Sequence, residues 1–426
     1  MSRSDRRPPL TVVSLLALLA PLALAGAPAA AQRVAFVTSA TGTGDLGYWP
    51  QAGGQVGAAA GDEICQALAS AAGLANPGNF VAWLSDASDD AYCRVHGLSG
   101  TRAGNCGEPS LPAAAGPWVR TDGMPFAGPV QQLTTAGLVY LPLLLDEHGV
   151  DIAPLPDAST RTATTSDGTL YPADAACADW TSSAIGSFTA NGTPSQTTDG
   201  WTNAGQISCA GGQRLVCLER VAGPPLPAPA VKLRRAFLTS ASGHGELASW
   251  PAADPGTSGV AAGDSICRNL AQAAGWAEAS SFKAWLSTAS TAAPDRFAND
   301  GPWVTADNVV VAWSVADLTD GVLETSIHVT EQGQHLGNYG VWTGTQDDGL
   351  ARPERCAEWT SASGGDQGAS GASDRTRFGW SWSFGAAACD ATYLHLYCLS
   401  DAAGPFFADG FDWGTTTAWS SVQSPP

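Results

Sequence analysis

The chain has 426 residues, 44% of them hydrophobic, which is enough for two or three separate cores. Only 14% are charged, against roughly 25% in ordinary soluble proteins. The 39 acidic and 20 basic residues leave a formal charge of −19. Such an acidic excess repels phosphate, which argues against nucleic acid and anionic lipid as partners. We interpret the charge mainly as a source of solubility.

Residues 1–31 are typical of a secretory signal peptide. An arginine-bearing start precedes an apolar run over residues 10–24, and three alanines close the segment. The run contains Pro21 and is too short for a membrane span. No cysteine precedes Cys65, so none stands at the cleavage site to carry a lipid. We expect a mature chain beginning at Gln32 that is secreted, extracellular or periplasmic, has no membrane span and is not a lipoprotein.

The chain then contains two copies of one module. Residues 61–85 and 263–287 align without a gap and share G-D-x-I-C, L-A-x-A-A-G and F-x-A-W-L-S. A Gly-Pro-Trp-Val run and a Cys-Ala-(Asp/Glu)-Trp-Thr-Ser run also recur. Repeats of this length are tandem domains, because solenoid periods are much shorter. The predicted organisation is a first domain (33–220), a Pro/Ala-rich linker (221–233), a second domain (234–400) and an unmatched tail (401–426).

Each module is predicted to be α+β, loop-rich and stapled by disulfides. In the second copy Asp264 is a candidate N-cap of a helix that Gly275 ends. Residues 236–240, 282–286 and 393–400 have the alternation of strands. The remaining sequence is rich in Gly, Ser, Thr and Asp, which predicts long loops that need covalent support.

The ten cysteines are expected to form five disulfides, because the count is even and the chain is exported. None has the C-x-x-C spacing of a zinc site. In each copy the helix cysteine and the last-strand cysteine lie on predicted core faces, so we pair them, which leaves the middle two as partners. The extra pair in the first copy is assigned by nearness, and no free thiol remains. The predicted pairs are Cys65–Cys217, Cys177–Cys209, Cys93–Cys106, Cys267–Cys398 and Cys356–Cys389.

These motifs carry a family resemblance. The order G-D-x-x-C, A-x-G-(L/W), F-x-A-W-L-S, W-x-G-T-x-x-D-G, C-x-x-W-T and a final cysteine pair is similar to endostatin. More closely, it resembles the bacterial endostatin-like family of unknown function, which includes spirochaetal surface lipoproteins. The resemblance covers nearly all of both repeats and implies a C-type-lectin-like fold with nested disulfides, first to fourth and second to third. Residues 406–421 of the tail are similar to short endings of secreted proteobacterial proteins.

The two copies depart from this pattern differently. The second copy has "VWTGTQDDG" at residues 341–349, and the first has "TRTATTSDG" in its place. Arg161 therefore stands where the second copy has Trp342, and Asp167 is what remains of the acidic pair Asp347 and Asp348. The cysteine that anchors the family's lipoproteins is also missing.

No catalytic or metal-binding residues are predicted. None of the six histidines is shared between the copies and no G-x-S-x-G elbow occurs, so we expect structural histidines and no enzyme activity. The acidic loops at 316–321 and 345–349 could offer oxygen ligands to calcium, but they lack EF-hand spacing, and an ordinary turn is favoured. Nothing matches the N-terminal histidine cluster that holds zinc in endostatin. No cofactor is expected.

Tryptophan is the strongest clue to binding. Ten of the chain's sixteen tryptophans form five pairs that recur between the copies, which favours core positions: Trp49/Trp250, Trp83/Trp285, Trp118/Trp303, Trp180/Trp359 and Trp201/Trp380. Unmatched tryptophans of the second copy are candidates for an exposed binding surface, the alternative being that they fill that copy's own core. They are Trp276, Trp313, Trp342 and Trp382. The candidate ligand-binding residues are Trp313, Trp342, Asp347, Asp348 and Trp382.

We therefore expect a non-enzymatic recognition or adhesion protein that binds a glycan, a host or matrix protein, or a cell-envelope component. The sequence does not choose among these partners. Two alternatives stay open: a structural envelope protein without a specific ligand, and an enzyme built on a lectin-like fold.

Overall fold

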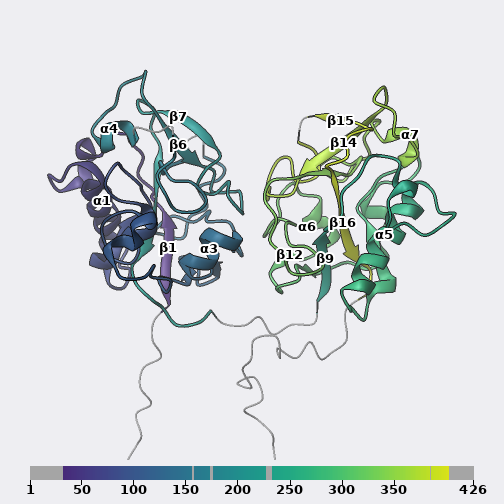
Figure 1. The fold of residues 1–426 in the computed structure, drawn as a ribbon, viewed down its shortest axis with the longest axis horizontal. Coiled ribbons are helices and arrows are strands. Elements are labelled where there is room, and N and C mark those ends of the chain that lie inside the picture. Colours follow the sequence, from purple (N-terminus) through teal and green to yellow (C-terminus); the bar gives the residue numbers. More distant parts are fainter. Residues whose placement is uncertain (1–31, 156–157, 173–175, 227–232, 384, 403–426) are drawn as a thin grey trace, which may run out of the picture. The chain divides into compact units, whose positions relative to one another are not determined.

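The structure is a computed structural model that describes residues 32–155, 158–172, 176–226, 233–383 and 385–402. The predicted signal peptide, residues 227–232 of the linker and residues 403–426 of the tail lie outside the described residues. The fold is mixed helix and sheet, with one eight-stranded sheet in each repeat and no strand shared between them (Figure 1). Across the described ranges, no helix combines the length and apolar character needed to cross a membrane. That each repeat folds alone stays a prediction.

Repeat 1 orders its sheet β4-β3-β1-β8-β5-β6-β7, and β2 also pairs with β8. The strands are β1 (Arg33–Val37), β2 (Phe80–Ala82), β3 (Trp118–Val119), β4 (Pro125–Ala127), β5 (Thr160–Arg161), β6 (Phe188–Gly192), β7 (Gly205–Ser208) and β8 (Arg214–Glu219). The helices are α1 (Gly57–Ala71), α2 (Ala91–Arg94), α3 (Val130–Ala136) and the left-handed turn α4 (Ala176–Trp180).

Repeat 2 has the same order, β12-β11-β9-β16-β13-β14-β15, with β10 on β16. The strands are β9 (Arg234–Leu238), β10 (Phe282–Ala284), β11 (Trp303–Val304), β12 (Val310–Ala312), β13 (Gly340–Trp342), β14 (Gln367–Ala372), β15 (Ala386–Ala388) and β16 (His395–Ser400). The helices are α5 (Gly259–Ala273), α6 (Val315–Leu318) and α7 (Cys356–Trp359).

The last strand of each repeat runs through the middle of its sheet. β8 lies antiparallel to β1, with Phe36 opposite Cys217, and β16 lies antiparallel to β9, with Phe237 opposite Cys398. Successive strand residues point to opposite faces. In β8, Cys217 joins the core cluster beneath α1, whereas Val216 joins the cluster on the other face. Because both faces are covered, all six residues of β8 and of β16 are buried.

All five predicted disulfides are confirmed. Each long helix places its cysteine under the sheet, where it meets the last strand: Cys65–Cys217 and Cys267–Cys398 have Cα–Cα distances of 5.6 and 5.5 Å. The three remaining bridges are Cys177–Cys209, Cys356–Cys389 and Cys93–Cys106, and the described residues contain no free cysteine. The ten tryptophans that recur between the copies are buried, each at most 5% exposed.

The start of the predicted helix needs correction. α5 begins at Gly259, five residues before the predicted cap Asp264. The Asp264 carboxylate instead accepts the Ala284 N–H at 2.9 Å and binds Arg296, and thereby holds the helix against β10. In sequence, a polar residue one turn inside a helix looks like an N-cap. The two roles can be distinguished only by the residue that the side chain contacts. The helix ends as predicted, before Gly275 at φ +80°.

Candidate functional site

Trp342 is a core residue, and its prediction as an exposed anchor is wrong. It ends β13, which lies between β14 and β16, and its side chain is fully buried. The indole Nε1–H donates to the Gly243 carbonyl oxygen at 2.9 Å, and the ring meets Trp359 edge-on.

Arg161 occupies the same place at the end of β5 and is also fully buried. Its guanidinium donates to the carbonyl oxygens of Ser208, at 3.0 Å, and Gly211. Burial lowers the pKa of Arg161 to about 10, which leaves it a cation at neutral pH. Neither copy therefore presents a ligand-binding side chain at this position.

Asp347 positions two loops. One of its carboxylate oxygens accepts the N–H groups of Ser381, at 2.9 Å, and Trp382, at 3.1 Å. The other accepts the Gly379 N–H at 2.7 Å. The carboxylate is thus engaged by the backbone of residues 379–382 and ties that loop to the one carrying Asp347. In the part of the chain that the structure describes, no group of three or more His, Cys, Asp or Glu side chains is arranged to hold a metal.

Asp348 is an exposed turn residue whose carboxylate accepts the Leu350 N–H at 3.0 Å. Trp313 is 54% exposed, as predicted, but lies on another segment, between β12 and α6. Its backbone N–H donates to Asp317 at 2.7 Å. Of the five predicted binding residues, the structure brings Asp347, Asp348 and Trp382 together in one pair of loops.

Trp382 lies at the rim of this pair of loops and is half-buried. The Arg352 guanidinium lies 4.3 Å from its ring centroid and is also paired with Glu354 at 3.1 Å. Leu350 is 59% exposed and Phe378 is 72% exposed on the same two loops. We call Leu350, Arg352, Phe378 and Trp382 the loop surface of repeat 2. An aromatic ring with a cation over it, flanked by exposed apolar side chains, can contact an apolar or stacking ligand.

Sequence reasoning missed Leu350, Arg352 and Phe378. A signal was present, because the aligned residues of repeat 1 are Thr169, Tyr171 and Asp199. Both exposed apolar residues of repeat 2 therefore align with polar residues of repeat 1. An unmatched apolar residue in a loop is ambiguous between core and surface until its exposure is known.

The equivalent loop of repeat 1 is covered by the insertion that carries Cys93–Cys106. The Tyr92 N–H donates to the Gly168 carbonyl oxygen at 3.0 Å, and the Leu170 N–H donates to Asp90 at 2.9 Å. The Arg102 side chain donates to the Asp167 carbonyl oxygen and lies 4.7 Å from the Tyr92 ring centroid. In repeat 2 the aligned Gly349 lies against Pro294 and Thr319, and its neighbour Leu350 is 59% exposed.

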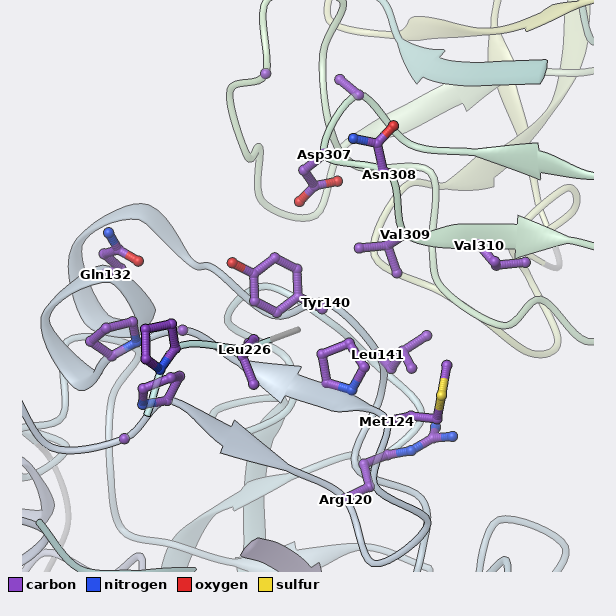
Figure 2. A pocket seen from close by; sticks show the side chains of 18 of the residues that line it. Arg120, Met124, Gln132, Tyr140, Leu141, Leu226, Asp307, Asn308, Val309 and Val310 are labelled. Atoms are coloured by element: carbon purple, nitrogen blue, oxygen red, sulfur yellow. The ribbon is translucent and has the colours of Figure 1, made fainter. Parts of the chain in front are cut away.

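A second polar cluster, also in repeat 2, links two histidines. The Ser326 hydroxyl lies 2.8 Å from His328 Nδ1, and His328 Nε2 lies 3.1 Å from His335 Nδ1. His335 Nε2 in turn lies 3.2 Å from the carboxylate of Asp307. Figure 2 shows Asp307 beside Asn308 on the turn between β11 and β12. The order Ser–His–His–Asp could relay a proton, but Ser326 is fully buried and His328 is 1% exposed.

Burial and the neighbouring His335 lower the pKa of His328 to about 3, so its ring is neutral at pH 7. Burial by itself would raise the pKa of Asp307, but the hydrogen bond and charge of His335 outweigh it and lower that pKa. His395, the first residue of β16, is 6% exposed, and its Nδ1 lies 2.6 Å from the Thr239 carbonyl oxygen. Burial lowers its pKa as well.

Comparison with known proteins adds no assignment. No protein-family model matches the chain, and no curated protein matches it.

Proposed function

We propose that this protein is an exported, non-enzymatic recognition protein built from two tandem C-type-lectin-like domains of the endostatin-like kind. Repeat 2 makes the principal contact with the ligand, through Leu350, Arg352, Phe378 and Trp382. The ligand is a glycan, a matrix protein or a component of the cell envelope. The observation that carries the proposal is the exposure of Phe378 and Leu350 on loops that Asp347 ties together.

Three features support the lectin-like assignment. Among the four cysteines that both repeats share, the disulfides are nested, first cysteine to fourth and second to third. The first and last strands are neighbours in the middle of the sheet, and one long helix packs beside them. Long loops make up most of the rest. The five disulfides also suit an oxidising compartment outside the cytoplasm.

The loop surface meets two physical requirements of a binding site. Exposed apolar side chains gain free energy when a partner covers them, at roughly 25 cal/mol per Å². The loops are also held in place before binding, because one carboxylate accepts three N–H groups. Preorganisation lowers the conformational entropy lost on association. Repeat 1 lacks the exposed apolar side chains, because its aligned residues are Thr169 and Asp199.

The test is a glycan and matrix-protein array probed with the full chain. The variant Leu350→Thr/Phe378→Asp carries the residues that repeat 1 has at these positions. We expect its affinity for a saturable ligand to be about thirtyfold lower than that of the wild type. This corresponds to about 2 kcal/mol, the usual cost of removing a central anchor. Tyr393→Ser is the control, because Tyr393 is also exposed, at 65%, but lies between β15 and β16.

Three outcomes would count against the proposal. Unchanged binding by the double variant would show that the loop surface is not the site. The absence of any saturable ligand would favour the structural envelope protein. Release of a cleaved product from an arrayed glycan would favour the enzyme.

A further inference from the structure

The sheet of repeat 1 ends on an open edge strand. β7 pairs with β6 and has no strand on its other side within the described residues (Figure 1). Gly205 and Gln206 are exposed, and Ile207 and Ser208 are half-buried. An unpaired edge offers a row of backbone donors and acceptors to another extended chain.

Two large apolar side chains lie beside this edge. Phe188 is opposite Ser208 in the β6–β7 register and is 51% exposed. Ile185 is 81% exposed, and its carbonyl oxygen accepts the Ser208 hydroxyl at 3.0 Å. Apolar groups gathered next to an unpaired strand are typical of an interaction surface.

Repeat 2 protects the corresponding edge. Its aligned residues are Gly364 for Ile185 and Gln367 for Phe188. Exposed carboxylates also stand in place of two neutral residues: Asp366 aligns with Ser187, and Asp390 aligns with Ala210.

The Asp390 carboxylate lies directly against Gly364, because a Cβ on that glycine would come within 2.7 Å of it. Charged side chains at an edge strand block pairing with another chain. The same fold thus carries a protected edge in repeat 2 and an unprotected one in repeat 1.

We propose that β7 is a docking edge at which a second copy of this chain adds its own β7, antiparallel, and so joins two repeat 1 sheets across a two-fold axis. Phe188 and Ile185 of each copy cover the junction. The contact is independent of the loop surface of repeat 2 and of any ligand bound there.

Charge argues for a second copy as the occupant. A two-fold axis places each side chain near its own counterpart, so any charge at the edge would face its like. In a chain with a formal charge of −19, Asp199 is the one charged residue between positions 182 and 213. A basic foreign partner would instead be attracted by carboxylates such as those of repeat 2. An uncharged apolar edge therefore fits self-pairing best.

A four-residue strand with two apolar side chains is small beside the roughly 1,200–2,000 Å² of a stable interface. We therefore expect a weak dimer that dissociates on dilution. Sedimentation velocity of the full chain over a wide concentration range measures it. Two variants introduce the residues of repeat 2 into repeat 1: Ile185→Gly/Phe188→Gln, and Ser187→Asp/Ala210→Asp.

Each variant is expected to weaken dimerisation at least tenfold without lowering the melting temperature, because repeat 2 folds with the same residues. Tyr48→Ser, at a position 84% exposed elsewhere in repeat 1, is the control and should leave the dimer unchanged. A wild-type chain that stays monomeric at every concentration overturns the proposal. So does a dimer that both variants leave intact, or one that Tyr48→Ser abolishes.

A cross-link tests the pairing directly and does not depend on the folding of the edge variants. Gln206→Cys places a thiol on the exposed part of β7 and should give covalent dimers under mild oxidation. Gln367→Cys, at an exposed position of β14 in repeat 2, should remain monomeric. Equal cross-linking at both positions would contradict a specific β7 contact.

Discussion

Repeats 1 and 2 have equivalent strands, β5 and β13, beside the last strand of the sheet, but the two strands end in chemically different residues. Arg161 ends β5 and Trp342 ends β13, and both side chains are fully buried. Each donates to backbone carbonyl oxygen, Arg161 to Ser208 and Gly211 and Trp342 to Gly243. The fold therefore tolerates a cation or an aromatic ring at this position. In both repeats the side chain supplies N–H donors to backbone carbonyl groups.

The repeats also differ in where they use titratable side chains. In repeat 1, Asp122 is paired with Arg120 at 2.6 Å; the aligned Asp307 of repeat 2 is paired with His335. Leu144 stands where repeat 2 has the buried His328. Repeat 1 thus uses a permanent cation and an apolar residue where repeat 2 uses imidazoles, so repeat 2 should respond to pH in a way that repeat 1 does not.

The largest expected effect separates Trp342 from Arg161. Trp342→Ala should lower the free energy of unfolding by about 3–5 kcal/mol, because it leaves a large cavity between α5 and the sheet. Arg161→Met should cost less, about 1–3 kcal/mol, since it strands two carbonyl groups but fills the volume and removes a desolvated cation. Urea denaturation of the full chain measures both. If Trp342→Ala lowered the free energy of unfolding by less than Arg161→Met does, Trp342 would not be a core residue.

A smaller effect should follow the protonation of His328. Its pKa is about 3 in the folded chain and about 6.5 when unfolded, so the folded state resists protonation. The unfolded state therefore gains protons first, and stability falls as pH drops below 6.5, by about 2 kcal/mol at pH 5. Asp374 works in the opposite direction, because burial raises its pKa to about 6 and its protonation favours the folded state.

The comparison of wild type with His328→Leu isolates the histidine, because Asp374 is common to both. Leucine is the residue that repeat 1 carries at this position. We expect the variant to gain about 2 kcal/mol relative to wild type between pH 7 and pH 5, whatever its stability at neutral pH. Denaturation across this range measures the slope, and parallel curves for the two proteins would contradict the buried neutral imidazole.

The smallest effect distinguishes the neighbours Asp347 and Asp348. Asp347→Ala should cost about 1–3 kcal/mol and speed hydrogen exchange at Gly379, Ser381 and Trp382, because these N–H groups lose their acceptor. Asp348→Ala should stay within about 0.5 kcal/mol, as expected for an exposed turn residue. Equal effects of the two substitutions would mean that the carboxylate of Asp347 does not hold the loops together.

Much of the fold could be predicted from the sequence, because it depends on local patterns of residues. The disulfides followed from cysteines on apolar faces, and the recurring tryptophans from the requirement that both copies fold. The binding residues were harder. The lack of a counterpart in repeat 1 predicts an exposed Trp342, yet the pairing of β13 with β16 makes it part of a central strand, where it is buried. Phe378 and Leu350 became candidates only when their exposure was known.

The repeat and the order of the cysteines can be read directly from the sequence. The long helix of each module and the core strands could also be predicted, because they depend on the periodicity of side chains within a short stretch of chain. Only the tertiary contacts show which apolar residues face solvent, and that Asp347 rather than Asp348 accepts hydrogen bonds from the neighbouring loop. The tertiary structure also placed His328 beside His335, and it left the outer edge of β7 without a neighbouring strand among the described residues. These features depend on contacts between segments far apart in the chain, and a pattern of residue types does not specify which neighbour fills the space beside each one.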